Sequence, residues 1–249
     1  NEVVSLEMFV IVSMSIPEGY SFWRFQHVGG FMYRIVDLYD TDHTLAKDYL
    51  LSFRYPWEAL KGIKDMIISL GKTLGDDYVE VSPQVWVHKT ATVFPSAYLG
   101  APCIIGAGTE VRHSAFIRGA ALVGDNCVVG NSVELKNVIL FDNVQTPHYN
   151  YVGDSILGYK SHMGAGSITS NVKSDKTLVV IKNGDERIET GIKKVGAMLG
   201  DYVEVGCNSV LNPGTVIGRH SNVYPTSCVR GVIPEGCIHK NDGTIVRKV

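Results

Sequence analysis

The chain has 249 residues, a formal net charge of −2 at pH 7 and 26 glycines. A net charge this small, with both signs mixed, does not produce the positive potential that binding to nucleic acid or an anionic membrane needs. No apolar stretch reaches the ~20 residues of a membrane-spanning helix. Five cysteines without a C-x-x-C pair argue against a disulfide framework or a zinc knuckle and are typical of small buried residues in a reducing compartment.

The first predicted segment, residues 1–77, ends in helices. Its start carries an apolar run but no basic signal-peptide region, and we assign it no function. Asp40 or Thr41 can cap a helix that ends at Leu51, and Pro56 suits the first turn of a second helix with a 3.6-residue apolar period. We expect these helices to cap the end of the following domain, because the end of a solenoid otherwise exposes apolar residues and unpaired edges.

From residue 78 the apolar period changes to six. An aliphatic residue recurs at every sixth position, and a small or β-branched residue follows four positions later. This is the signature of hexapeptide repeats, in which three hexads make one coil of a parallel β-helix. We therefore predict an all-β fold, with the β-helix at 78–235, an insertion at 172–198 and a C-terminal tail at 236–249. The first aliphatic positions are Val81, Val87, Val93, Leu99, Ile105, Val111, Ile117, Val123, Val129 and Leu135.

The repeat is irregular between Glu134 and Asn171. Two of its steps, 135–140 and 152–157, are five residues long, and the stretch contains E-x-K, P-H-x-x-Y-x-G-D and G-A-G-S-I-T-x-N. Together these motifs resemble the acetyltransferase domain of the bifunctional N-acetylglucosamine-1-phosphate uridyltransferase/glucosamine-1-phosphate acetyltransferase family, in its archaeal-type variety. The resemblance covers roughly residues 78–235.

The resemblance implies a left-handed coil and a homotrimer with active sites in the grooves between prisms. It also implies a cytoplasmic transferase of UDP-N-acetylglucosamine biosynthesis that acetylates an amino-sugar 1-phosphate with acetyl-CoA as co-substrate. Neither a membrane nor a nucleic acid is expected as a partner.

His148 in the P-H-x-x-Y-x-G-D motif is the predicted general base. Acetyl transfer to an amine needs a base with a pKa near neutrality, which is the range of histidine. The alternative is a surface histidine on a turn.

The resemblance assigns further residues to the substrate. Basic residues 18 positions apart should stack on one face of the prism and bind phosphate, although exposed basic residues are often only solvated. A lysine of the insertion would add a further phosphate contact if that segment arches over the groove of a neighbouring chain. The alternative is that the insertion is a solvated hairpin. The residues are Arg118 and Lys136 for phosphate, Tyr151 and Asn171 for the amino sugar, Glu134 beside them, and Lys176 in the insertion.

Four more positions match the reacting group and the acetyl-CoA channel. The Ala165 N–H would stabilise the developing oxyanion, although Gly-Ala-Gly also suits a tight corner. His162 stands where the family usually has Asn, and it could donate a hydrogen bond near the reacting carbonyl. Cys207 and Pro225 would line the channel, and nothing in the sequence activates Cys207 as a nucleophile.

The sequence bears on three other functions. Residues 1–77 lack the Gly-rich pattern of the family's nucleotidyltransferase domain. A zinc γ-type carbonic anhydrase would need a third ligand beside His113 and His148, and the expected position holds Gly153, so no metal site is predicted. A non-catalytic sugar-nucleotide-binding or assembly module of the same fold stays open because of His162.

Overall fold

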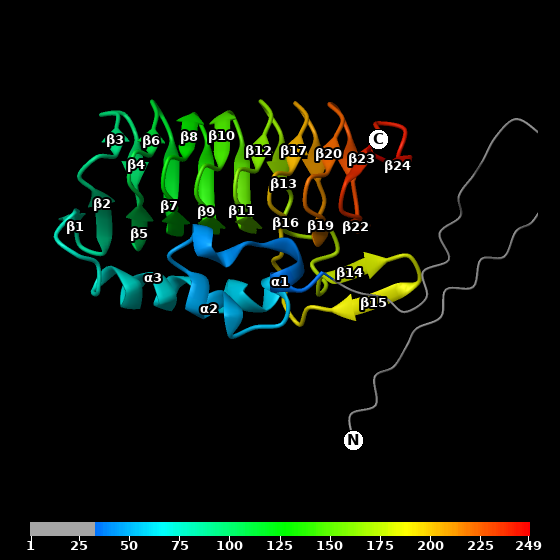
Figure 1. The fold of residues 1–249 in the computed structure, drawn as a ribbon, viewed down its shortest axis with the longest axis horizontal. Helices are drawn as coiled ribbons and strands as arrows, with labels where there is room; N and C mark the ends of the chain where they lie inside the picture. Colours follow the sequence, from blue (N-terminus) through cyan, green and yellow to red (C-terminus); the bar gives the residue numbers. More distant parts are fainter. Residues whose placement is uncertain (1–32) are drawn as a thin grey trace, which may run out of the picture. The chain divides into compact units, whose positions relative to one another are not determined.

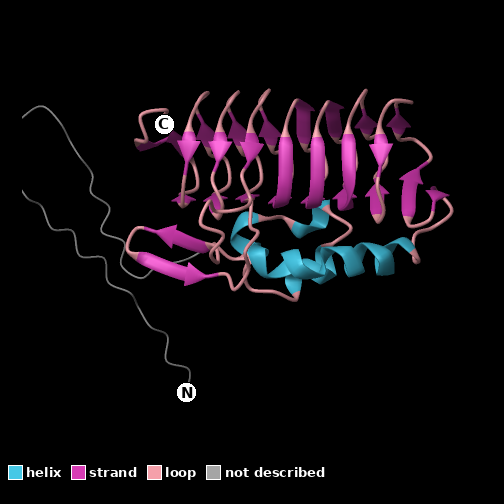
Figure 2. Cartoon of the chain, turned by 180° about the vertical axis from the view of Figure 1, so that it is seen from behind, coloured by secondary structure: helices cyan, strands magenta, loops and turns pink. Residues whose placement is uncertain are grey.

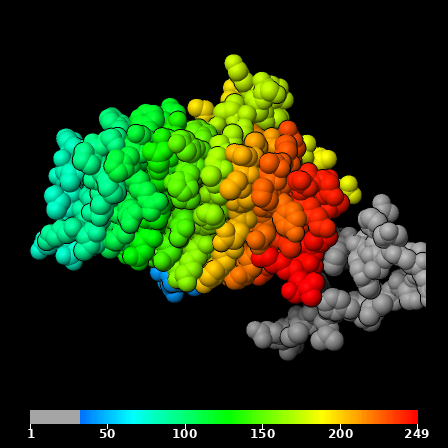
Figure 3. Space-filling view, turned by 90° about the horizontal axis from the view of Figure 1, so that it is seen from above, coloured from blue at the N-terminus to red at the C-terminus, as the bar shows by residue number. Residues whose placement is uncertain are grey.

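The computed structural model describes residues 33–249, so the apolar run at the start of the chain lies outside the described residues. A parallel β-helix forms the body, with coils stacked along its long axis (Figure 1). In the space-filling view successive coils appear as bands from green to red (Figure 3). The predicted fold class, a left-handed parallel β-helix with an N-terminal helical segment, is confirmed.

The N-terminal segment holds three α-helices and two 3₁₀ helices. These are α1 (Ile35–Leu38), η1 (Thr41–His43), α2 (Lys47–Leu51), η2 (Pro56–Gly62) and α3 (Ile63–Gly71).

The β-helix has three faces, which we number in chain order. The first face consists of β2 (Val85–His88), β5 (Cys103–Ile105), the second halves of β7 (Phe116–Val123), β9 (Glu134–Leu140) and β11 (Tyr151–Leu157), then β16 (Ala197–Leu199), β19 (Thr215–Ile217) and β22 (Val232–Ile233). The second face consists of β3 (Thr92–Val93), β6 (Glu110–Val111), β8 (Val128–Asn131), β10 (Gln145–His148), β12 (His162–Met163), β17 (Glu204–Val205), β20 (Asn222–Val223) and β23 (Cys237–His239). The third face consists of β4 (Tyr98–Leu99), the first halves of β7, β9 and β11, then β13 (Ile168–Thr169), β18 (Val210–Leu211) and β21 (Cys228–Val229).

The core follows the six-residue period. Every repeat aliphatic from Ile105 to Leu135 is fully buried, and Val93 and Leu99 are partly buried. The five-residue steps also hold, since Leu140 and Leu157 are both buried. A register irregularity between Ile117 and Gly119 of β7 compensates for the first short step in β9.

The first coil begins later than the spacing predicts. Val81, predicted to point inward, is 56% exposed, because it lies on β1 (Tyr78–Ser82), an antiparallel strand at the edge of the first face. The parallel coil starts at Val85 on β2, which pairs with Cys103.

The C-terminal end of the repeat also differs. Strand β23 continues the second face beyond residue 235, where the tail was predicted to begin. Strand β24 (Ile245–Arg247) then folds back antiparallel on β23 and covers the edge of that sheet.

The sequence predicted that the helices cap the end of the solenoid. In the structure they lie along its first face instead (Figure 2). Asn137 Nδ2 donates to the Leu60 carbonyl at 3.1 Å, and the Asp201 N–H donates to the Leu38 carbonyl at 3.0 Å. The reason is that the outward side chains of this face are also apolar, and packing the helices on them removes that apolar surface from water. Buried outward residues of this kind are Ile104, Leu122, Ile139, Ile156, Met198 and Val216.

The insertion forms a hairpin of β14 (Val180–Asn183) and β15 (Glu186–Glu189). It packs on its own chain, since Val179 and Ile181 are fully buried and lie against Gly214. Among residues 33–249, no helix is long and apolar enough to span a bilayer.

Candidate functional site

A polar cluster lies where the third face turns into the first. Its centre is the carboxylate of Asp154, which is only 3% exposed and accepts hydrogen bonds from three side chains. Lys136 Nζ lies 3.0 Å from both Asp154 carboxylate oxygens. Asn137 Nδ2 donates to Asp154 Oδ1 at 2.9 Å, and Asn171 Nδ2 donates to Asp154 Oδ2 at 2.5 Å. The buried carboxylate therefore fixes a cation and two amides at one corner.

The corner needs a special backbone conformation in three successive coils. Ala120, Asn137 and Asp154 occupy equivalent positions, with φ of 49°, 54° and 49°. Asn and Asp tolerate this left-handed region better than most residues. The backbone thus turns sharply beneath Lys136 and Gly153, which lie side by side on β9 and β11.

Tyr151 and Asn171 complete the cluster on the third face. The Asn171 amide donates to the Tyr151 hydroxyl at 3.2 Å. Burial raises the pKa of Tyr151, and the negative charges of Asp154 and Glu134 raise it further. Gly153 leaves the space for this contact, because a Cβ there would lie 2.5 Å from the Tyr151 hydroxyl.

Arg118 and Glu134 form the exposed edge of the cluster. Arg118 Nη1 lies 2.8 Å from Glu134 Oε1, and this hydrogen bond raises the pKa of Arg118. The sequence predicted that Arg118 stacks on Lys136, with Glu134 beside them. The structure corrects the stacking, because the irregularity in β7 places Gly119 opposite Lys136. Glu134 pairs with Arg118, and Asp154 holds the lysine.

His148 lies at the corner between the second and third faces, at the end of β10. Its imidazole is exposed and makes no hydrogen bond or ion pair within the described part of the chain. Its carbonyl accepts the Gly166 N–H at 3.0 Å, which places the Gly164–Gly166 turn one coil above it. The adjacent Ala165 N–H has no acceptor among residues 33–249.

Ala165, Cys207 and Pro225 form a column along this corner. The Asn208 N–H donates to the Ala165 carbonyl, and a Cβ on Gly164 would lie 2.7 Å from the Cys207 nitrogen. A Cβ on Gly206 would likewise lie 2.4 Å from the Pro225 nitrogen. Glycines thus let the backbone of each coil approach the next, and the column rises directly above His148.

The structure does not bring every predicted residue to the Asp154 cluster. His162 lies on the second face, where its Nδ1 is 2.8 Å from Glu204 Oε2. Lys176 lies in an exposed turn of the insertion, without an ion-pair partner in the described chain.

One residue of the cluster and one beside it were missed from sequence. Asp154 was part of the P-H-x-x-Y-x-G-D motif but received no role. Lys194 forms a β-bridge with Val172 and so lies beside Asn171, where the insertion rejoins the prism. The charge pattern of the insertion did not distinguish it from the other lysines there.

No metal-binding group stands out. Within residues 33–249 there is no cluster of three His, Cys, Asp or Glu side chains that could hold an ion.

Comparisons with known proteins agree with the motifs. A family model described as "GMPPB C-terminal domain" matches residues 102–233, more than half of the chain. A bifunctional protein GlmU from Methanococcus maripaludis is 30% identical over 206 residues, which is 81% of this chain and 50% of that protein. A bifunctional sugar-1-phosphate nucleotidylyltransferase/acetyltransferase from Sulfurisphaera tokodaii is 26% identical over 208 residues, 78% of this chain and 52% of the other.

Among solved structures, the polySia-specific acetyltransferase NeuO aligns with a TM-score of 0.44 and 13% identity, over 64% of this chain and 80% of the other. A likeness this low supports no statement on activity. The chain spans about half the length of the curated relatives it matches. The resemblance to GlmU-type bifunctional proteins that the motifs predicted is confirmed, and by its match to the family model the chain belongs to the GMPPB C-terminal domain family.

Proposed function

We propose that the chain is an acetyl-CoA-dependent N-acetyltransferase that acts on an amino-sugar 1-phosphate such as glucosamine 1-phosphate. The observation that carries this proposal is the cluster on the third face, where Arg118, Lys136, Tyr151 and Asn171 converge. The names of the relatives support it, since they include sugar-1-phosphate nucleotidylyltransferase/acetyltransferases that match this chain over half of their length.

The phosphate would bind to the basic edge of the cluster. The Arg118 guanidinium is about half-exposed and can turn from Glu134 to two phosphate oxygens. Lys136 adds a charge that Asp154 holds in place. The exposed Lys194, whose backbone bridges to Val172 next to Asn171, would add another. Convergent cations of this kind are what recognition of a phosphate dianion requires.

Acetyl-CoA would lie along the column of Ala165, Cys207 and Pro225. The free Ala165 N–H then points a backbone donor at the thioester oxygen, which becomes negative as the tetrahedral intermediate forms. A single donor of this kind typically contributes on the order of 10²-fold or more to the rate.

His148 would act as the base. Its exposed imidazole takes a proton from the attacking amine, the C–N bond forms, and the C–S bond breaks. The proton then passes to the leaving CoA thiolate, so that the products are the N-acetyl sugar phosphate and free CoA. General base catalysis of this kind typically supplies 10²–10⁴-fold.

The site would be shared between copies of the chain. Within one chain the Asp154 cluster and His162 lie on different faces, and one sugar phosphate cannot touch both. Within residues 33–249 the helices cover the first face, which leaves the second and third faces to meet another copy. A homotrimer that sets the second face of one chain against the third face of the next would join the two groups.

The test is turnover of the purified chain with acetyl-CoA, measured by release of free thiol, with glucosamine 1-phosphate and galactosamine 1-phosphate as acceptors. We expect thiol release that depends on the acceptor, with one N-acetyl product formed per thiol. Binding of either sugar phosphate without any thiol release would instead favour the non-catalytic module.

A further inference from the structure

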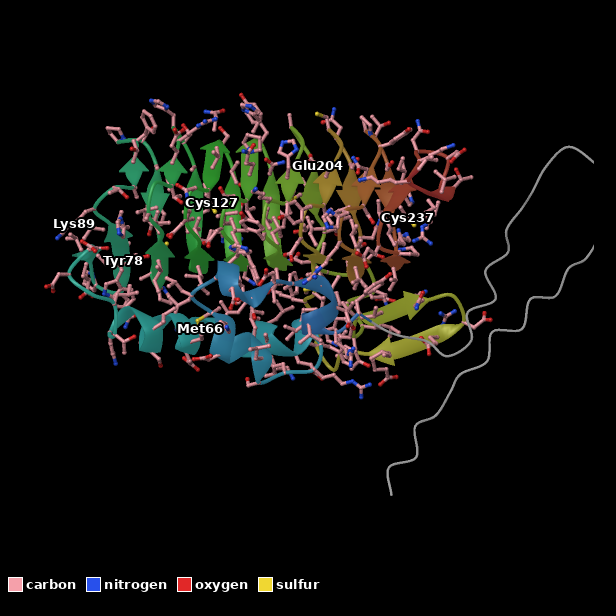
Figure 4. The ribbon with its side chains drawn as sticks, viewed as in Figure 1. Met66, Tyr78, Lys89, Cys127, Glu204 and Cys237 are labelled. Atoms are coloured by element: carbon pink, nitrogen blue, oxygen red, sulfur yellow. The ribbon has the colours of Figure 1, made fainter. Side chains whose placement is uncertain are left out.

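A second polar pocket lies on the second face, away from the Asp154 cluster. Its volume is about 420 Å³, within the 300–1,000 Å³ of typical small-molecule sites. Figure 4 labels Glu204 in this region, among the strands of the nine-stranded sheet. The lining residues are Asn143, Gln145, Lys160, Ser161, His162, Tyr202 and Glu204.

The central feature of the pocket is the pair of His162 and Glu204. They are neighbours on β12 and β17, and His162 Nδ1 lies 2.8 Å from Glu204 Oε2. A carboxylate can only accept a hydrogen bond, so Nδ1 must carry the proton. In neutral His162 the other nitrogen, Nε2, therefore carries a lone pair, and it can accept a hydrogen bond but not donate one.

In the neutral form His162 has a role that differs from the predicted one. The sequence suggested that it donates a hydrogen bond near the reacting carbonyl. A neutral imidazole with Nδ1–H bound to Glu204 has no N–H left to donate at Nε2. It selects a ligand group that donates, such as a hydroxyl.

The rest of the pocket has the same preference for a polar, hydroxyl-rich ligand. Gln145 pairs with His162 across the strands, and its side-chain amide has no partner within the described chain. Gln145 is exposed, so its amide can both donate to and accept from a ligand in the pocket.

Lys160 supplies a cation at the rim of the pocket. Its Nζ lies 5.2 Å from the ring centre of Tyr159 and 5.8 Å from that of Tyr202, and it forms no ion pair in the described part of the chain. The two rings restrict the lysine by cation–π contacts. The pocket thus combines the acceptor nitrogen of neutral His162, amides and a cation, which matches a sugar that carries a nearby anion.

We propose that this pocket reads a hydroxyl group of the acceptor sugar, with His162 Nε2 as the acceptor and Glu204 as the residue that positions it. The proposal rests on the proposed function and deepens it, because it names the residues that distinguish sugars differing in one hydroxyl. In the shared site, the pocket of one chain would face the sugar whose phosphate is bound by the next chain. A site that hydrogen-bonds a hydroxyl rejects the analogue that lacks it, because its own polar group is then left unpaired.

The test compares kcat/KM for glucosamine 1-phosphate with that for its 3-deoxy, 4-deoxy and 6-deoxy analogues. We expect the native chain to lose about 10-fold or more with one analogue, which corresponds to one lost hydrogen bond. In His162→Ala and Glu204→Gln, kcat/KM should be about equal for glucosamine 1-phosphate and for that deoxy analogue. His162→Asn keeps a hydrogen-bond acceptor, so it should restore part of the difference in kcat/KM between the two substrates. Glu110→Gln is the matched control, because Glu110 lies on the same face but outside the pocket and pairs with Arg112.

Selectivity unchanged in both His162→Ala and Glu204→Gln would overturn the proposal, as would a native chain that is indifferent to all three deoxy analogues. If the native chain turns over no amino-sugar phosphate, the proposed function fails. Saturation-transfer NMR with N-acetylglucosamine 1-phosphate then tests the pocket separately. Weaker binding in His162→Ala than in Glu110→Gln supports the pocket, and equal binding contradicts it.

Discussion

Asp154 organises the candidate site at the scale of single residues. It is buried, it forms an ion pair with Lys136, and it fixes the amides of Asn137 and Asn171. No substrate contact needs to be assumed for this role. The carboxylate sets the positions of the groups that the proposed function places around the sugar phosphate.

Replacement of Asp154 by Asn should destabilise the chain. The amide keeps the size and tolerates the positive φ, but it leaves Lys136 without its counter-charge in a partly buried position. We expect a loss of about 2–3 kcal/mol in the free energy of unfolding, measured by urea denaturation. The control is Asp175→Asn in the exposed insertion, where no measurable loss is expected. An equally small effect at both positions would contradict the role assigned to Asp154.

The sequence was sufficient to find the residues that carry a motif, and it failed where a role depends on the register. Arg118, Lys136, Tyr151 and Asn171 were predicted together and lie together. The partners were predicted wrongly, because a single irregular residue in β7 changes which side chains stand opposite each other. Glu204 could not be linked to His162 either, since the insertion separates them in sequence and hides their one-coil relation.

The long strands β7, β9 and β11 are the elements that build the site. Each continues from the third face into the first, whereas the coils above and below divide into shorter strands. The five-residue steps remove one residue from the corner and thereby bring Lys136 and Gly153 next to each other. The insertion leaves the prism at Asn171 and rejoins it at Val195, whose N–H donates to the Asn171 carbonyl.

The packing of the insertion on its own prism can be tested at Gly231. A Cβ there would lie 2.7 Å from the backbone carbonyl of Lys182, and φ is +77°. Gly231→Ala should therefore cost more than the ~1 kcal/mol of a left-handed alanine, in total about 2 kcal/mol in urea unfolding. Gly184→Ala at the hairpin tip shares the positive φ but has open space around it, so it should cost only about 1 kcal/mol. Equal losses would show that the hairpin does not rest on Gly231.

The six-residue period predicted the strands well because each coil repeats the same burial. It did not reveal where the helices lie, yet a signal was present. Ile104 and Leu122 are 18 residues apart, point outward from the first face and are aliphatic. A second apolar row outside the inward positions indicates a covered face, and the predicted end cap overlooked it.

At the scale of the whole molecule the three faces have different roles. The first is covered by helices, the second carries the polar row around His162, and the third carries the Asp154 cluster and two exposed aromatic residues. Tyr98 is 59% and Phe116 is 43% exposed, and their ring centres lie 5.6 Å apart. Adjacent exposed aromatic residues are typical of a surface that meets another protein.

The shared site requires that the chain associates. We expect a mass of three chains by light scattering, and a shift to smaller species when Phe116→Glu places a charge in the proposed contact. Ser69→Glu, an exposed position on α3 over the covered first face, is the control for the added charge. A native chain that stays monomeric at all concentrations but acetylates sugars would refute the arrangement between copies.

The most direct test of acetyl transfer at the corner between the second and third faces is thiol release by His148→Ala beside His113→Ala. His113 occupies the same corner two coils below and is the matched control, with its ring packed on Phe94. We expect His148→Ala to lose 10²–10⁴-fold in kcat with an unchanged unfolding midpoint, and His113→Ala to keep most of the activity. Full activity in His148→Ala would contradict the account, and so would equal losses in both variants.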